Sequence, residues 1–166
     1  MRTPAVTAQP GRARPAGRLL MVNFAACMLL LIQYLLGMAV NLYVTLPGQH
    51  PGAGARDYFT GAASGLAWVI PHGPAWAAAH AAFGLALVLA ALASIALTRR
   101  DRSRPATVTS ALGALAILGA GFNGASFLNY GHASSSMIMA GLWALALACY
   151  ITGVFLAARR LDRGPA

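Results

Sequence analysis

Three polar side chains stand at a similar depth inside apolar segments of the chain. Asn41, His80 and Asn123 each lie six or seven residues, about 9 to 10 Å, inside the expected outer end of a helix. His80 is the one histidine inside an apolar segment, and a buried imidazole needs partners for both ring nitrogens. We therefore expect the helices to bring the three residues together, with His80 bonded to Asn41 or Asn123 and locking the helices.

Ligation of haem or a metal ion is the alternative role for His80. Helical bundles hold cofactors with side chains on facing helices, and Met137 or Met139 could supply a second axial ligand of the His/Met type. His72 lies eight residues, about 12 Å, from His80 on one helical path, so one iron cannot take both histidines. This alternative predicts a b-type haem site formed by His80 with Met137 or Met139.

Gln33 belongs to a stripe of polar and small residues. Gln33, Gly37 and Asn41 follow one another at four-residue intervals, a pattern that joins membrane helices. A path for a small solute would need more polar residues on the other helices, and the four long apolar segments contain no Asp, Glu, Lys or Arg. Because ion-coupled carriers usually place an ionisable residue in the membrane, small-solute transport is only a second alternative.

The remaining candidate residues lie mostly outside the apolar segments. His50, His72, His132 and Asp57 are of types that bind zinc or copper, but no two are spaced as HxH or HxxxH, so we assign no metal to them. Residues 134–136 are three serines without a GxSxG context, and we expect them to cap the helix that follows.

The two cysteines of the chain lie inside apolar runs. Cys27 and Cys149 have no CxxC spacing, which leaves a disulfide-exchange site without support. We expect both to pack as small hydrophobic side chains.

The elements that must position these residues are membrane-spanning helices. Of the 166 residues, 58% are hydrophobic and 9% are charged, with a mean hydropathy of +0.64, which excludes an ordinary soluble enzyme. We expect spans at about 19–46, 74–98, 106–130 and 134–158, within a membrane domain of residues 18–160. The apolar segment 57–70 is too short to span and is expected to form a helix in the outer interface, between the first and second spans. Residues 1–17 are predicted to form a disordered tail and 161–166 a short one.

The positive charge of the chain has a topological explanation. The formal net charge is +9 and every basic residue is arginine, with eleven of the twelve in clusters before the first span, between the second and third, and after the fourth. This positive-inside pattern predicts that both termini are cytoplasmic and that the protein lies in the inner membrane. The arginines are expected to contact anionic lipid headgroups, and nucleic acid is not expected as a partner.

A weak twofold repeat predicts two related helix hairpins. Glycine and asparagine are four residues apart at 37 and 41 and again at 119 and 123, near the outer ends of the first and third spans. The second and fourth spans each carry a ridge of small residues at every fourth position, at 78, 82, 86, 90 and 94 and at 136, 140, 144, 148 and 152. Such ridges let membrane helices approach closely. The expected fold is therefore an all-α four-helix bundle built from two hairpins.

The stretches GMAVNLYVTLPG, HGPAWAAAHAAFG and GFNGASFLNYG resemble those of uncharacterised four-span membrane proteins of bacteria with GC-rich genomes. The resemblance covers residues 19–158 and implies no particular activity. In outline the chain is also loosely similar to four-helix haem proteins such as the cytochrome b561 and haem A synthase groups. Those groups place paired histidines on their helices, whereas this chain has a single one there.

The absence of a catalytic constellation decides the functional expectation. We expect a small non-enzymatic membrane protein that acts as an accessory or binding module, with another membrane protein or further copies of itself as possible partners. Haem binding through His80 and transport of a small solute are the alternatives.

Overall fold

In a computed structural model of the chain, the described residues, 13–100 and 103–162, form five helices and no strand. They are α1 (Ala13–Tyr43), α2 (Tyr58–His72), α3 (Ala75–Arg100), α4 (Arg104–Tyr130) and α5 (Ala133–Asp162). All but α2 are long and apolar enough to cross a membrane. These findings support the prediction of an all-helical, multi-pass membrane protein.

The helix bounds differ from the expected spans mainly at the ends. α1 begins at Ala13, inside the segment expected to be disordered, and α5 continues to Asp162. Residues 1–12 and 163–166 of the predicted tails lie outside the described residues. α1 ends at Tyr43 rather than near Leu46, because Pro47 disfavours helical geometry in the residue before it and cannot continue a helix.

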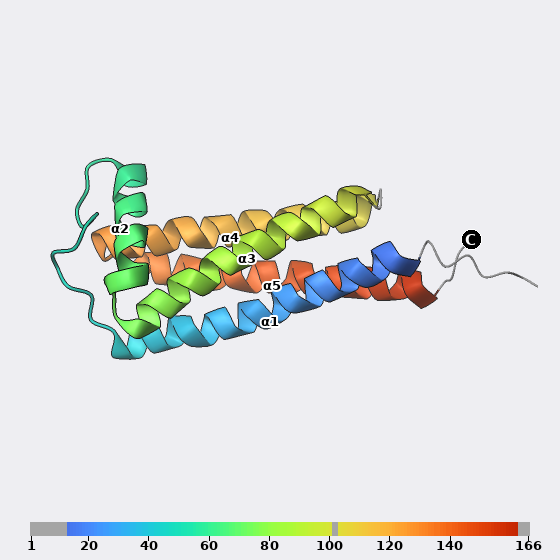
Figure 1. Cartoon of the computed structure of the whole chain (residues 1–166), viewed down its shortest axis with the longest axis horizontal. Coiled ribbons are helices and arrows are strands. Elements are labelled where there is room, and N and C mark those ends of the chain that lie inside the picture. The colour runs from blue at the N-terminus through green and yellow to red at the C-terminus, as the bar shows by residue number, and fades with distance from the viewer. Residues whose placement is uncertain (1–12, 101–102, 163–166) are drawn as a thin grey trace, which may run out of the picture.

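The four long helices lie side by side along their length (Figure 1). α1 packs against α3 and α5, and α4 packs against the same two helices. Within the described part of the chain, the backbone of α1 does not come close to that of α4, nor that of α3 to that of α5. Each long helix therefore has two neighbours, and side chains on α3 and α5 face each other only across the centre.

The short helix α2 lies across one end of the long helices, roughly at right angles to them (Figure 1), and contacts α3 and α4. Asp57 caps its first turn by accepting a hydrogen bond from the Thr60 backbone N–H at 2.9 Å. Pro71 lies in its last turn, and the Gly73 N–H closes that turn by donating to the Val69 carbonyl. A separate helix thus forms where the sequence predicted a segment too short to span.

A tight turn joins α4 to α5. Gly131 has a φ of +68° and its N–H donates to the Phe127 carbonyl, which ends α4 with a left-handed cap. The two helices of this hairpin pack closely, with Gly113 of α4 against the ring of Tyr150. The serines at 134–136 lie in the first turn of α5, which starts at Ala133, so they stand at the start of the fourth span as predicted, although the helix begins one residue before the first of them.

The predicted ridge of small residues on α5 does not form a packing surface, whereas the ridge on α3 is partly buried and includes Ser94. On α5, Ala140, Ala144, Ala148 and Thr152 are all exposed, and on α3 Ala82 is exposed. The buried positions of α5 instead include Ala146, Tyr150, Gly153 and Ala157. On α5, spacing alone predicted the wrong face, because in an alanine-rich helix small residues occur on several sides.

Candidate functional site

His80 is paired with Gln33, on the contact between α3 and α1. The Gln33 Nε2 donates to the His80 carbonyl oxygen at 3.0 Å and stands 3.3 Å from the His80 Nε2. Gly37 follows one turn later on α1, and a Cβ there would stand 3.2 Å from the His80 Cε1. The imidazole therefore fills the space that a glycine leaves open, and the His80 Nδ1 is buried without a hydrogen-bond partner.

The other two members of the predicted polar layer lie elsewhere. Asn41 donates to the Ser136 Oγ at 3.2 Å and so joins α1 to α5. Asn123 donates to the Gly119 carbonyl of its own helix at 2.9 Å. The expectation that Asn41 or Asn123 bonds to His80 was wrong. His80 instead meets α1 at Gln33, which lies about two helical turns further from the outer end of α1 than Asn41 does.

The structure does not bring together the residues of the alternative haem site. His80 is on α3, whereas Met137 and Met139 are on α5, whose backbone does not come close to that of α3 within the described residues. Met137 is 77% exposed, and the Met139 sulfur packs against Gly124 of α4. The His80 Nε2 faces Gln33, and its ring edge is closed off by Gly37.

A buried polar cluster that the sequence analysis missed joins three helices near the opposite end. The Ser94 hydroxyl of α3 donates to the Asn23 Oδ1 of α1 at 2.8 Å, and it lies 2.8 Å from the Ser110 hydroxyl of α4. Since the Ser94 proton is used on Asn23, Ser110 is the donor to Ser94. All three side chains are buried. The signal available in the sequence was one asparagine inside an otherwise apolar stretch.

The fourth helix closes this cluster through a glycine. Gly153 of α5 lies so close to Asn23 that a Cβ at that position would stand 2.7 Å from the Asn23 Nδ2. The Asn23 Nδ2 and the Tyr150 hydroxyl are buried without hydrogen-bond partners. The cluster, which we call the Asn23 lock, therefore contacts all four long helices and consists of neutral groups only.

An apolar layer separates the Gln33–His80 pair from the Asn23 lock. On α1, Asn23 and Gln33 are ten residues, about 15 Å, apart. The space between them is occupied by a buried cluster that includes Cys27, Leu30, Leu87 and Ile117. No group of three or more His, Cys, Asp or Glu side chains lies together among the described residues.

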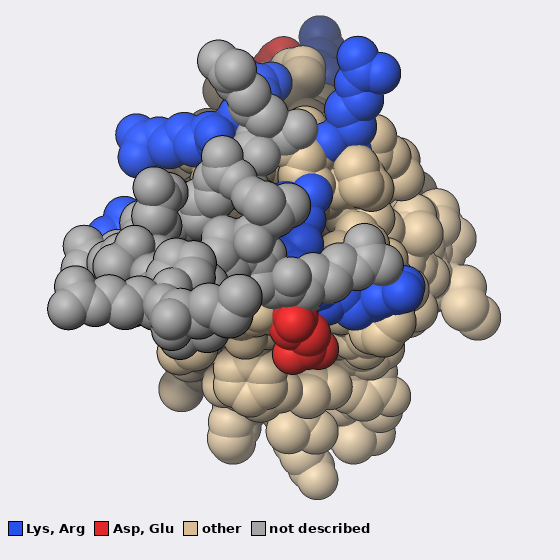
Figure 2. All heavy atoms as spheres, turned by 90° about the vertical axis from the view of Figure 1, so that its right-hand side faces the viewer, with Lys and Arg blue, Asp and Glu red and all other residues tan. Residues whose placement is uncertain are grey.

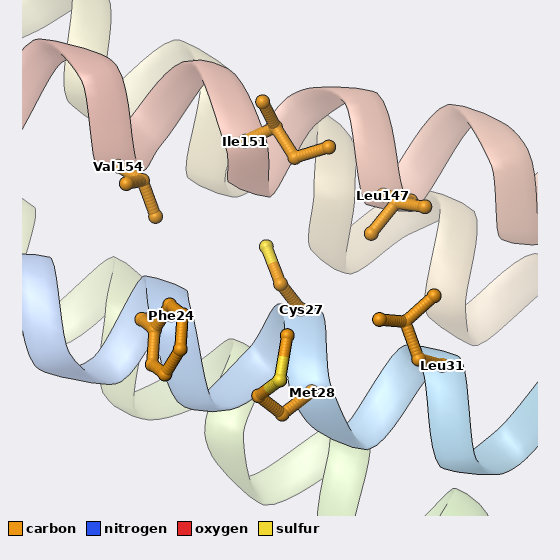
Figure 3. A pocket seen from close by; sticks show the side chains of 7 residues that line it. All are labelled: Phe24, Cys27, Met28, Leu31, Leu147, Ile151 and Val154. Carbon is orange, nitrogen blue, oxygen red and sulfur yellow. The ribbon is translucent and has the colours of Figure 1, made fainter.

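A groove between α1 and α5 is open along the side of the molecule (Figure 3). Its volume is about 300 Å³, and its lining is entirely apolar: Phe24, Cys27, Met28 and Leu31 of α1 and Leu147, Ile151 and Val154 of α5. Figure 3 shows the Cys27 side chain directed across the groove towards α5. Cys27 is a free and buried thiol, which agrees with its expected packing as a small hydrophobic side chain, and Cys149 is a free thiol that is half-buried.

The outer-loop residues considered as metal ligands are dispersed. His50 stacks on Trp68, Asp57 caps α2, and the ring of His132 lies against that of Tyr130. The N–H donation from Thr60 holds the pKa of the Asp57 carboxyl below its ordinary value. No metal centre is formed by these side chains in the part of the chain that the structure describes.

Hydrogen bonds hold the segment 44–57 and α2 against the end of α4. The Tyr58 hydroxyl donates to the Phe122 carbonyl, and the Tyr130 hydroxyl donates to the Ala55 carbonyl. The Gly54 N–H donates to the Asn129 carbonyl at 2.9 Å. This end of the molecule is therefore covered by a fixed arrangement of a loop and a short helix.

Comparison of the chain with protein-family models, with curated proteins and with solved structures found no match.

Proposed function

We propose that this chain is a small non-enzymatic multi-pass membrane protein, a four-helix bundle that acts as a binding or accessory module. The observation that carries the proposal is the contrast between the interior of the helix bundle and the groove on its side. The interior polar groups, the Gln33–His80 pair and the Asn23 lock, form contacts between helices. The α1–α5 groove, by contrast, offers an apolar surface that, among the described residues, is lined by α1 and α5 alone.

The proposed orientation places both termini in the cytoplasm. The start of α1, the end of α3, the start of α4 and the end of α5 lie at the end opposite α2 (Figure 1). Figure 2 shows arginine side chains distributed around that end, and Asp162 is the only described acidic residue there. By the positive-inside rule, this end is on the cytoplasmic side of a bacterial inner membrane in the proposed orientation. The helix α2 then lies in the outer interface.

The proposed ligand of the groove is an anionic phospholipid. The groove extends over about 10 Å of α1, from Phe24 to Leu31, and has the apolar lining that an acyl chain requires. Arg18 lies six residues, about 9 Å, beyond Phe24, and Arg159 lies five residues, about 7.5 Å, beyond Val154. Basic side chains at headgroup depth attract anionic lipids. One phospholipid molecule would therefore place an acyl chain in the groove and its headgroup near the arginines.

Native mass spectrometry of protein released from nanodiscs tests this proposal. With equal amounts of phosphatidylglycerol and phosphatidylcholine of the same acyl chains, we expect the anionic lipid to be retained preferentially. Ile151→Trp fills the groove and should reduce retention, whereas Leu115→Trp, at a 65% exposed position on α4, should not. Equal retention of both lipids by all three proteins would refute the proposal.

The accessory role predicts a protein partner in addition to lipid. Affinity purification in mild detergent should recover a second membrane protein or a homo-oligomer in fixed ratio. Recovery of a coloured monomer alone would exclude the accessory role and favour the haem alternative.

A further inference from the structure

The Gln33–His80 pair leaves two of its polar atoms unused. Among the described residues, the His80 Nδ1 and the Gln33 Oε1 are buried and have no hydrogen-bond partner. Both atoms belong to the contact between α1 and α3, which pack against each other along their length (Figure 1). Buried polar atoms in proteins nearly always have a hydrogen-bond partner, and an orphaned one is costly. Two orphaned atoms in one pair therefore point to a bound group that is not a side chain of the bundle.

The contact with Gln33 fixes which ring nitrogen of His80 carries the proton. The Gln33 Nε2 has two N–H groups and cannot accept a hydrogen bond. It donates to the His80 carbonyl oxygen at 3.0 Å, and because that oxygen only accepts, it sets the orientation of the amide. The same Nε2 of Gln33 stands 3.3 Å from the His80 Nε2, so this ring nitrogen is the acceptor of the second N–H. The proton of the imidazole is therefore on Nδ1, the nitrogen without a partner.

The two unused atoms are of complementary kinds. The His80 Nδ1–H is a donor that lacks an acceptor, and the Gln33 Oε1 is an acceptor that lacks a donor. A hydroxyl group does both, because it donates one hydrogen bond and accepts others. The group is expected to be neutral, since the apolar segments around the pair contain no Asp, Glu, Lys or Arg that could balance a charge.

Packing of the helices does not itself require a polar ring at this contact. A Cβ at Gly37 of α1 would stand 3.2 Å from the His80 Cε1. In the hairpin of α4 and α5, a Cβ at Gly119 would stand 3.1 Å from the Cδ1 of Leu142. A leucine therefore packs against a helical glycine as closely as the imidazole does. The hydrogen-bonding groups of Gln33 and His80 thus add a capacity that close packing does not demand.

We infer that the Gln33–His80 pair is a binding site for the hydroxyl group of a neutral molecule, which is either water or a lipid-soluble alcohol. Gln33, Gly37, His80 and Gly84 are all half-buried, so the pair lies near the side of the bundle, within reach of molecules in the bilayer. A bound alcohol keeps its apolar part in the lipid and directs its hydroxyl group to the pair. The site lies between α1 and α3, away from the α1–α5 groove, so it does not depend on the phospholipid proposal.

Nitrogen NMR of the full chain in phosphatidylcholine nanodiscs, with isotope-labelled histidine rings, tests the site. His80→Leu identifies the His80 signals and should fold, because Leu142 already makes such a contact in the other hairpin. We expect His80 to be protonated on Nδ1 alone. Decanol should then shift the Nδ1 proton downfield in a saturable way, whereas decane should not. Cross-relaxation of that proton with water, unchanged by decanol, would instead identify water as the bound hydroxyl. A proton on Nε2, or an Nδ1 proton that responds to neither decanol nor water, would overturn the inference.

Two further variants separate the site from general effects of the alcohol on the bilayer. Gln33→Met removes the acceptor Oε1 and the amide that fixes the ring proton, so the proton should distribute over both ring nitrogens and the response to decanol or water should be lost. Asn123→Leu is the matched control, because the Asn123 amide donates to the Gly119 carbonyl of its own helix. It should preserve the Nδ1 proton and its response. A response that survives in Gln33→Met, or that disappears in Asn123→Leu as well, would refute the site.

Discussion

Replacing Gly153 with alanine should strain the Asn23 lock. A Cβ at residue 153 would stand 2.7 Å from the Asn23 Nδ2 and 3.0 Å from its Cγ, both closer than real Cβ contacts. Asn23 is completely buried, so its amide can move away only by breaking the hydrogen bond from Ser94. Overpacking of this kind costs about 1–3 kcal/mol in free energy of unfolding.

Gly141→Ala on the same helix is the matched control. No atom lies within 4 Å of the position that a Cβ at residue 141 would occupy. Both substitutions replace a helical glycine and gain roughly 1 kcal/mol of helix propensity, so that gain cancels when the two variants are compared. Gly153→Ala should therefore be less stable than Gly141→Ala by about 1–3 kcal/mol.

Unfolding in mixed detergent micelles, followed by circular dichroism, measures these differences. Asn23→Ala should cost stability in the natural background but relieve the clash in Gly153→Ala, with a coupling free energy of about 1–3 kcal/mol. Gly153→Ala and Gly141→Ala of equal stability, or the absence of any coupling to Asn23→Ala, would refute the packing of α5 onto Asn23.

Three further predictions concern other parts of the structure. The purified protein should show no Soret band. His80→Ala should lower the free energy of unfolding by about 0.6 kcal/mol and by no more than about 2 kcal/mol, as expected for a polar contact between membrane helices. A haem spectrum that is lost in that variant would contradict this prediction. Asp57→Ala should speed amide exchange in the first turn of α2, because the Thr60 N–H loses its acceptor. Since the folded state lowers the pKa of Asp57, the cap contributes fully above the ordinary carboxyl pKa and is lost as the pH falls through the lowered value, so acid should reproduce the effect of the substitution. Gly131→Ala should cost roughly 1 kcal/mol, measured by the same unfolding assay, because φ there is +68°.

Local features of the sequence determined the number of helices and most of their limits. A membrane-spanning helix needs about 20 consecutive apolar residues, so each of the four long apolar segments identifies a helix without knowledge of its neighbours. Pro47 and Gly131 end helices through their own backbone geometry, and Asp57 caps α2 through a contact three residues away. The separate segment after Asp57 was likewise recognisable because it is apolar yet short.

The partners of the polar side chains were decided by the tertiary structure alone. Gln33 and His80 were both identified as polar positions in apolar segments, but their pairing depends on the rotation and axial offset of α1 against α3. Helices that are apolar on all sides carry no stripe that fixes this rotation, and an every-fourth pattern of alanines does not replace it. The Asn23 lock and the separation of His80 from Met137 likewise depend on the rotation and axial offset of the helices, which the sequence pattern does not specify. In lipid, close packing fixes them, and packing is a property of all four helices together.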